Sequence, residues 1–280
     1  ASFNYDNHRG LTLNLGGAAS HFNADHFGHV LWVGTPYYKG AAGQPLTLTD
    51  RAPNFQYYSN NAKKNDANIY AKVQWEFVRG LSAFADLQYR HVGSDIEGQT
   101  DTWDSQGQVN VNLDARFDFL NPKFGLNWQP SPHHRLYASY AIAHREPTRD
   151  NYIENLNERV TSERLNDLEV GYQFRTQRLY AGINLYHMNY RDQFVLTGLL
   201  DDEGEAITKN IPRSYRMGIE LEAAWQPVDW LRWTANATVS KNRASDRLGR
   251  LDDYSTEVGL GVTNRARSLI HIRRRRRTGT

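Results

Sequence analysis

The residues best suited to bind a small ligand lie in one short stretch of the sequence. Arg145, Glu146, Arg149 and Tyr152 combine two planar cations, a carboxylate and an aromatic ring. A guanidinium binds a carboxylate or a catecholate through paired hydrogen bonds, because its donors form a rigid fork. This stretch is therefore predicted to contact a ligand. The alternative is that its side chains only pack on neighbouring loops.

Aromatic side chains form a second set of candidates. Tyr37, Tyr38 and Trp103 lie in segments without strand-like alternation. Flat rings of this kind stack on aromatic or sugar rings. We predict that they contribute to the same ligand-binding surface.

Signals for catalysis and for metal binding are poor. The chain has no cysteine, and it contains neither G-x-S-x-G nor H-E-x-x-H nor a glycine-rich loop that opens a helix. His21, His26 and His29 could in principle bind haem or a metal, but no helix presents them on one face. We expect no enzyme activity, no resident cofactor and no metal site.

The elements that position these residues are predicted from alternation with a period of two. From Arg216 to Gln226 and from Leu231 to Ser240, apolar and polar residues alternate, as in two-sided strands. About eleven such segments occur, and most reach the roughly 9 to 11 residues that a tilted strand needs to cross a bilayer. The mean hydropathy of −0.71 does not oppose this, because membrane strands average to polar. The fold is predicted to be an all-β, antiparallel transmembrane β-barrel.

The connections between these segments alternate in length. Short ones are predicted near residues 78–80, 130–134, 175–177 and 227–229, and long ones at 34–66, 91–116, 145–164, 196–213 and 243–257. Outer-membrane barrels have short periplasmic turns and long external loops. The candidate ligand residues are therefore expected on the external side.

The charge of the chain is uneven. The net charge is +2, but residues 258–280 hold seven arginines and no acid, so the remainder carries 2 − 7 = −5. We interpret residues 264–280 as a basic tail that arises from truncation or a frameshift rather than as a nucleic-acid-binding arm. Residues 1–263 are then a partial barrel, and no nucleic-acid partner is expected.

Several blocks resemble the TonB-dependent outer-membrane receptors, in particular those of the Bacteroidetes group. They include NPKFGLNWQP at 121–130, RLYASYAIAHREPTR at 135–149, GINLYHMNYRDQFVLTG at 182–198 and SYRMGIELEAAWQP at 214–227. The resemblance implies a barrel of typically 22 strands in outer-membrane lipid, closed by an N-terminal plug and coupled to the TonB complex. It also implies uptake of a scarce ligand such as a ferric siderophore, haem or cobalamin. We expect this chain to be about half of such a barrel, without plug or TonB box.

Two other functions remain open at this point. One is a soluble or surface-anchored all-β adhesion module that binds glycans, and the other is a porin-like passive channel. The apolar face of residues 216–226 distinguishes the adhesion module from a membrane barrel, because a soluble β-sandwich would bury this face in a protein core.

Overall fold

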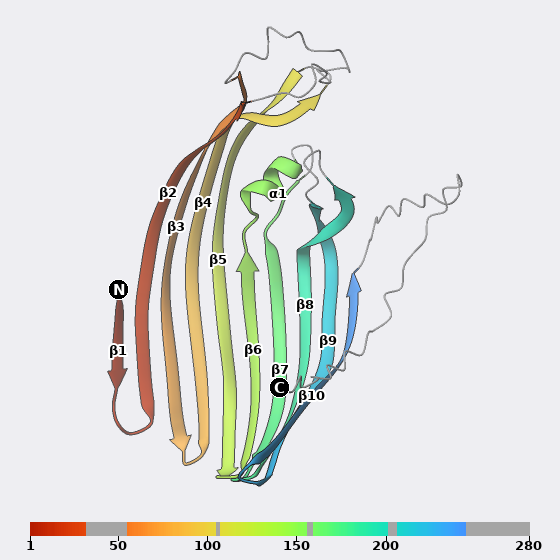
Figure 1. Ribbon diagram of the computed structural model, residues 1–280. Coiled ribbons are helices and arrows are strands. Elements are labelled where there is room, and N and C mark those ends of the chain that lie inside the picture. Colours follow the sequence, from red (N-terminus) through yellow and green to blue (C-terminus); the bar gives the residue numbers. More distant parts are fainter. Residues whose placement is uncertain (32–54, 105–106, 156–158, 201–205, 245–280) are drawn as a thin grey trace, which may run out of the picture.

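The described residues of the computed structural model form one curved antiparallel sheet (Figure 1). They comprise residues 1–31, 55–104, 107–155, 159–200 and 206–244. The elements are β1 (Ser2–Asp6), β2 (Leu11–Val30), β3 (Phe55–Val78), β4 (Leu81–Asp104), β5 (Gly107–Ser131), β6 (His134–Arg145), α1 (Arg149–Glu154), β7 (Glu163–Arg175), β8 (Leu179–Leu200), β9 (Ala206–Val228) and β10 (Leu231–Ala244).

The strands pair in chain order, so each is a hairpin partner of the next. The predicted all-β antiparallel barrel portion is confirmed, with ten strands in the described residues where about eleven were expected. β1 and β10 are the two edges, and the sheet does not close on itself.

Tight turns join the strands at one end of the sheet, as predicted. Gly80 lies in the turn between β3 and β4 with φ of +76°. A Cβ atom there would lie 2.4 Å from the carbonyl oxygen of Gln129, so this turn needs glycine. The chain can therefore reverse within two residues beside the end of β5.

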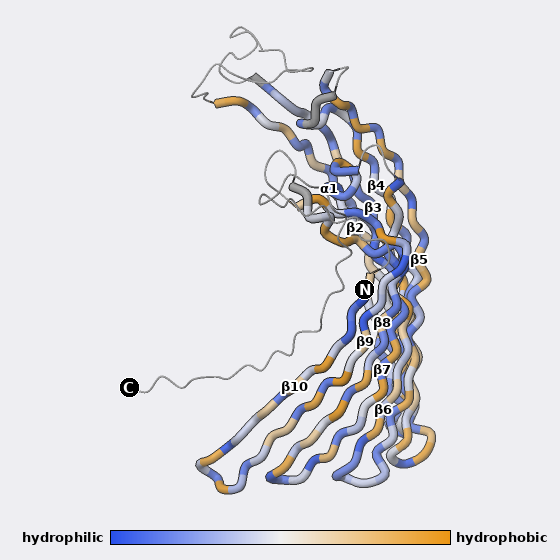
Figure 2. Tube along the Cα trace, turned by 90° about the vertical axis from the view of Figure 1, so that its right-hand side faces the viewer, coloured by the Kyte–Doolittle hydropathy of each residue, from blue (hydrophilic) through white to orange (hydrophobic). Residues whose placement is uncertain are grey.

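The half of each strand next to these turns is apolar on its convex side. Ile69 is 65% exposed and Trp75 55% exposed, and both lie on the same face of β3. The partner strands continue this surface, since directly opposed residues share a face: Leu87, Leu126, Leu168, Leu185 and Leu221 are likewise exposed. We call this surface the apolar belt. Figure 2 shows the alternation of hydrophobic and hydrophilic residues along the strands. An apolar band without a protein partner is typical of strands that face acyl chains.

In the other half of β3, β4 and β5 the apolar residues lie on the opposite side. Val92, Ile96, Val111 and Phe119 point to the concave side, and each is at most 4% exposed. Asp118 and its neighbours of the same parity on β5 are exposed on the convex side. The period of two continues through the strand, but its phase reverses.

The observed strand bounds correct the predicted connections at 91–116 and 196–213. β4 continues to Asp104 and β5 starts at Gly107, while β8 continues to Leu200 and β9 starts at Ala206. Strand pairing beyond the belt gives the backbone hydrogen bonds that a loop would leave to water. These two predictions of long irregular loops were therefore wrong.

The predicted connection at 145–164 contains a helix. Thr148 caps α1 by accepting a hydrogen bond from the backbone N–H of Asn151, and the Asn151 side-chain oxygen in turn accepts one from the Thr148 backbone N–H. With six residues, α1 is too short to cross a membrane, and no other helix occurs in the described part of the chain.

Candidate functional site

The described residues of the connection between β6 and β7, 146–155 and 159–162, lie on the concave side of the sheet. Tyr152 packs with Ala62, Ile96 and Val111, which come from β3, β4 and β5. Four partly buried side chains surround this cluster: Leu113, Ala115, Phe117 and Val160. The apolar residues beyond the belt therefore form a small core with the connection as its cover.

An ionic network holds the start of this connection. The Glu146 carboxylate accepts hydrogen bonds from Lys64 at 2.8 Å and from two Arg90 nitrogens, each at 2.8 Å. Arg90 also donates to Asp66, with its shortest contact at 2.5 Å. The Glu146 side chain is only 12% exposed. Its burial raises the pKa, but the hydrogen bonds from Arg90 and Lys64 outweigh this and hold the pKa at about 2.

The far end of the connection is attached to β9. The Asn151 side chain donates to the Thr208 hydroxyl at 2.7 Å, and Glu154 accepts from the Thr208 backbone N–H at 3.0 Å. Asn155 donates to the Thr208 carbonyl at 2.9 Å. Contacts with β3 and β4 at one end and β9 at the other require the connection to span the concavity.

The two candidate arginines differ in their surroundings. Arg145, at the end of β6, donates to Glu163 at 2.5 Å and lies 5.4 Å from the Phe194 ring centroid, yet remains 55% exposed. Arg149, on α1, donates to the Asn60 side chain at 3.0 Å and contacts Asp150 at 3.3 Å. Both guanidinium groups lie near the loop end of the sheet, and Arg145 is the more accessible. Their contact with a ligand stays a prediction.

The aromatic candidates are not brought together in the described structure. Tyr152 is 8% exposed, and burial raises its pKa to about 12, with Glu146 adding a smaller effect. Its hydroxyl is buried without a hydrogen-bond partner among the described residues. A ligand could reach it only if the connection moved. Tyr37 and Tyr38 lie outside the described residues, as does the Trp103 side chain, whose backbone belongs to β4.

On the concave side of the strands that form the belt, the carboxylates of Glu220 and Glu222 have uncharged hydrogen-bond partners. Among the described residues, neither Glu220 nor Glu222 forms an ion pair with Arg216 or Arg232. Asn184 donates to Glu220 at 3.2 Å, and Tyr180 donates to Glu222 at 3.2 Å. Arg216 instead lies over the Tyr190 ring at 5.4 Å. This wall is therefore polar and acidic, as expected for one that faces water.

His21, His26 and His29 lie along β2. His21 shares a hydrogen bond of 2.7 Å with the Asn65 side chain. No group of three His, Cys, Asp or Glu residues close enough to hold a metal occurs within the described ranges.

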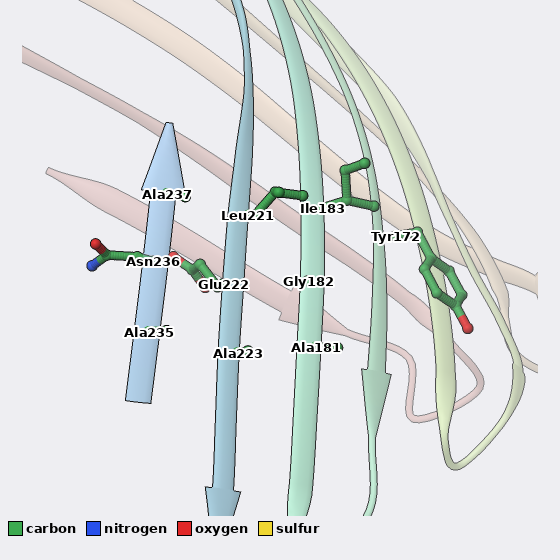
Figure 3. A pocket seen from close by; sticks show the side chains of 10 residues that line it. All are labelled: Tyr172, Ala181, Gly182, Ile183, Leu221, Glu222, Ala223, Ala235, Asn236 and Ala237. Atoms are coloured by element: carbon green, nitrogen blue, oxygen red, sulfur yellow. The ribbon is translucent and has the colours of Figure 1, made fainter. Parts of the chain in front are cut away.

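A hollow of about 360 Å³ lies on the convex side, within the apolar belt. Figure 3 shows its lining residues on β7, β8, β9 and β10, which include Ile183, Leu221 and four alanines. The small alanines leave this space where neighbouring strands carry larger side chains. It faces away from the connection, so it is a lipid-side hollow rather than part of the candidate ligand site.

Comparison with known families identifies the sheet. The family model for the β-barrel described as "TonB dependent receptor-like" matches residues 1–268. The chain belongs to this family. TonB-dependent receptor barrels lie in the outer membrane of Gram-negative cells, so the apolar belt faces outer-membrane lipid. The adhesion-module alternative is thereby excluded, and the family comprises transport receptors.

Solved structures agree with this assignment at the level of the fold. The chain is similar to the iron transporter FrpB of Neisseria meningitidis, with 17% identity and a TM-score of 0.58 over 87% of this chain and 34% of that one. The copper transporter OprC is 16% identical, with a TM-score of 0.63 over 87% of this chain and 36% of that one. The siderophore receptor PiuA of Acinetobacter baumannii is 14% identical, with a TM-score of 0.58 over 88% of this chain and 38% of that one. The chain therefore spans about a third of the length of these receptors. A search of curated proteins found no match.

Sequence reasoning missed the partners of Glu146 in this TonB-dependent receptor barrel. Lys64 and Arg90 are 82 and 56 positions away from it, so no local motif connects them. The outer half of β5 could have been predicted from the sequence, because apolar residues alternate there with polar ones: Val109, Val111, Leu113, Ala115 and Phe117. The prediction of a long connection at 91–116 overlooked this alternation.

Proposed function

We propose that this chain forms part of the wall of an outer-membrane receptor that imports a scarce anionic ligand, of the ferric siderophore class, with energy from the TonB complex. The observation that carries the proposal is the match of residues 1–268 to the TonB-dependent receptor barrel. Haem and cobalamin belong to the same broad set of cargoes.

The choice of an anionic iron chelate is supported by the residues at the loop end of the concave side. Arg145 is exposed there, and Arg149 is held nearby on α1. Guanidinium groups bind catecholate and carboxylate oxygens bidentately. Among similar structures are a ferric-catecholate import receptor and a siderophore receptor, at 12% and 14% identity.

The test replaces both arginines in the complete receptor that contains this chain. We expect the Arg145→Ala, Arg149→Ala double variant to bind a ferric tris-catecholate about tenfold more weakly, because charged hydrogen bonds are lost. A neutral ferric tris-hydroxamate should be affected less. Binding is measured by quenching of intrinsic fluorescence.

The matched control is Arg175→Ala, since Arg175 lies on β7 at the opposite end of the sheet. Unchanged affinity of the double variant for the catecholate would remove both arginines from the binding site. Equal weakening by Arg175→Ala would mean that overall charge, rather than this site, determines binding.

A further inference from the structure

Two neighbouring side chains hold the Arg145 guanidinium on different sides. Glu163 is directly opposite Arg145 in the pairing of β6 with β7, and its carboxylate accepts a hydrogen bond from the Arg145 Nε at 2.5 Å. The Phe194 ring, on β8, lies with its centroid 5.4 Å from the central guanidinium carbon. The group is therefore held through its Nε and through one face, and its far end is left to other partners.

The far end of the guanidinium is open. Within the described parts of the chain, neither Nη1 nor Nη2 of Arg145 donates a hydrogen bond, and the side chain is 55% exposed. Arg90 differs, because its Nη atoms donate to Glu146 and Asp66 and its side chain is only 22% exposed. Arg145 therefore offers a pair of parallel N–H donors to an outside acceptor, whereas Arg90 uses its donors within the chain.

The carboxylate that holds Arg145 is itself fixed. The Glu163 side chain is 11% exposed and belongs to β7, so it cannot follow a moving arginine. A long side chain loses rotamer freedom when it binds a ligand, and the bond to Glu163 removes much of that freedom beforehand. The same carboxylate places a negative charge beside the cation and reduces its attraction for any anion. The pair therefore weakens binding by charge and improves binding by geometry.

We propose that Glu163 and Phe194 are positioning residues, which hold Arg145 so that its Nη1–Nη2 edge selects ligands with two adjacent oxygen atoms. A catecholate or carboxylate group fits such an edge through two parallel hydrogen bonds. An anion of equal charge without adjacent oxygens gains from charge alone, which Glu163 opposes. This inference rests on the proposed function and narrows its ligand to chelates with paired oxygens.

The experiment compares two anions of equal charge on the complete receptor. A ferric tris-catecholate and ferricyanide are both threefold negative, but ferricyanide ends in nitrogen atoms and has no paired oxygens. Equilibrium dialysis gives both dissociation constants from the iron retained with the receptor. We expect Glu163→Leu to weaken tris-catecholate binding about fivefold, since holding one flexible side chain contributes about that much. Ferricyanide binding should stay the same or become tighter, because a negative charge is removed.

Two further variants separate position from charge. Glu163→Gln keeps an acceptor for Nε without the charge, so it should restore most of the tris-catecholate affinity that Glu163→Leu loses. Glu169→Leu is the matched control, because Glu169 lies on the same face of β7 without contacting Arg145. It removes the same charge and should weaken the binding of neither anion.

The ring is tested through its dependence on Arg145. Phe194→Leu should weaken tris-catecholate binding about threefold, which is the usual contribution of an exposed cation–π contact. In an Arg145→Ala background, neither Phe194→Leu nor Glu163→Leu should weaken it further, because both residues act through the guanidinium. Additional losses in that background would assign them a general structural role and overturn the proposal.

The remaining outcomes also decide. Weaker binding of both anions by Glu163→Leu would indicate damage to the fold, and tighter binding of both would indicate an effect of charge alone; either result overturns the proposal. Unchanged tris-catecholate affinity of Glu163→Leu, beside a weakened Arg145→Ala, would overturn the positioning role but leave the proposed function intact. Unchanged affinity of Arg145→Ala would remove Arg145 from the binding site and both proposals with it.

Discussion

The belt half and the outer half of β3, β4 and β5 have the same strand geometry, but their apolar side chains lie on opposite sides of the sheet. In the belt half, Leu126 faces lipid on the convex side while Lys123 faces the concavity. In the outer half, Phe119 is buried on the concave side while Arg116 faces water on the convex side. The solvent changes along the strand, and the side that is apolar changes with it.

The source of stability differs between the two halves. Belt side chains gain little from one another, because lipid would solvate them equally well. The outer core gains from the hydrophobic effect, because the β6–β7 connection removes it from water. Replacing a large side chain in the outer core should therefore leave a cavity. In the belt, lipid should fill the space that such a substitution leaves.

The largest effect is expected from Phe119→Ala. Phe119 is buried and stacks on Phe117 and His144, with ring centroids 5.6 and 5.2 Å away. Loss of the ring should lower the free energy of unfolding by about 4 kcal/mol. Urea unfolding in lipid vesicles measures it. Phe124→Ala is the control on the same strand, and its lipid-facing ring should cost less; equal losses would contradict the distinction between the halves.

A charged substitution in the belt tests the other half. Leu221→Arg places a cation among acyl chains and should lower the free energy of unfolding by about 3 kcal/mol. The neighbouring Glu220→Arg puts the same side chain on the concave side and should change stability far less. The same urea titration compares them. If both variants unfold alike, the convex side does not face lipid.

The ionic network should show a pH dependence. The pKa of Glu146 is lowered from its ordinary 4.5 to about 2, so its contribution is present above pH 4.5 and is lost as the pH falls towards 2. At neutral pH, Glu146→Gln should cost about 2 kcal/mol after allowance for screening by solvent. Proteolysis of the connection at pH 7 and pH 3 measures its release. Asp118→Asn, at an exposed pair with His91, is the control; an equal effect there would assign the pH response to surface charge.

The smallest effect is expected at Tyr152, with the opposite sign. Its buried hydroxyl has no partner among the described residues, so Tyr152→Phe should raise the free energy of unfolding by up to about 1 kcal/mol. Tyr137→Phe is the comparison, because that hydroxyl donates to Asn184 at 3.1 Å and its loss should destabilise. Thermal melting of both variants measures the difference. A stability loss at Tyr152 would indicate a polar partner for its hydroxyl.

The belt strands could be predicted from sequence because each one repeats a single rule. From Arg216 to Gln226 and from Leu231 to Ser240 the apolar residues all face lipid, and the strands were found where the pattern indicated. The tight turns followed as well. The strand segments that continue to Asp104 and Leu200 were missed, because a period of two does not say where the membrane ends.

The contacts of the candidate site could not be predicted from one sequence. Glu146 was singled out for its charge, but its partners come from β3 and β4, and the path of the β6–β7 connection over the concave side brings them together. Cross-strand neighbours such as Arg164 and Arg191 likewise depend on strand register, which period-two alternation leaves undetermined.

The phase reversal between Phe119 and Leu120 has a consequence for how deep the protein sits. If the barrel sank by one pair of residues, Asp118 would enter the acyl chains, and if it rose by as much, Leu120 would enter water. Either displacement is opposed, so the immersion depth is fixed by the strands themselves. A membrane that becomes thinner or thicker should therefore bend to meet this protein rather than shift it.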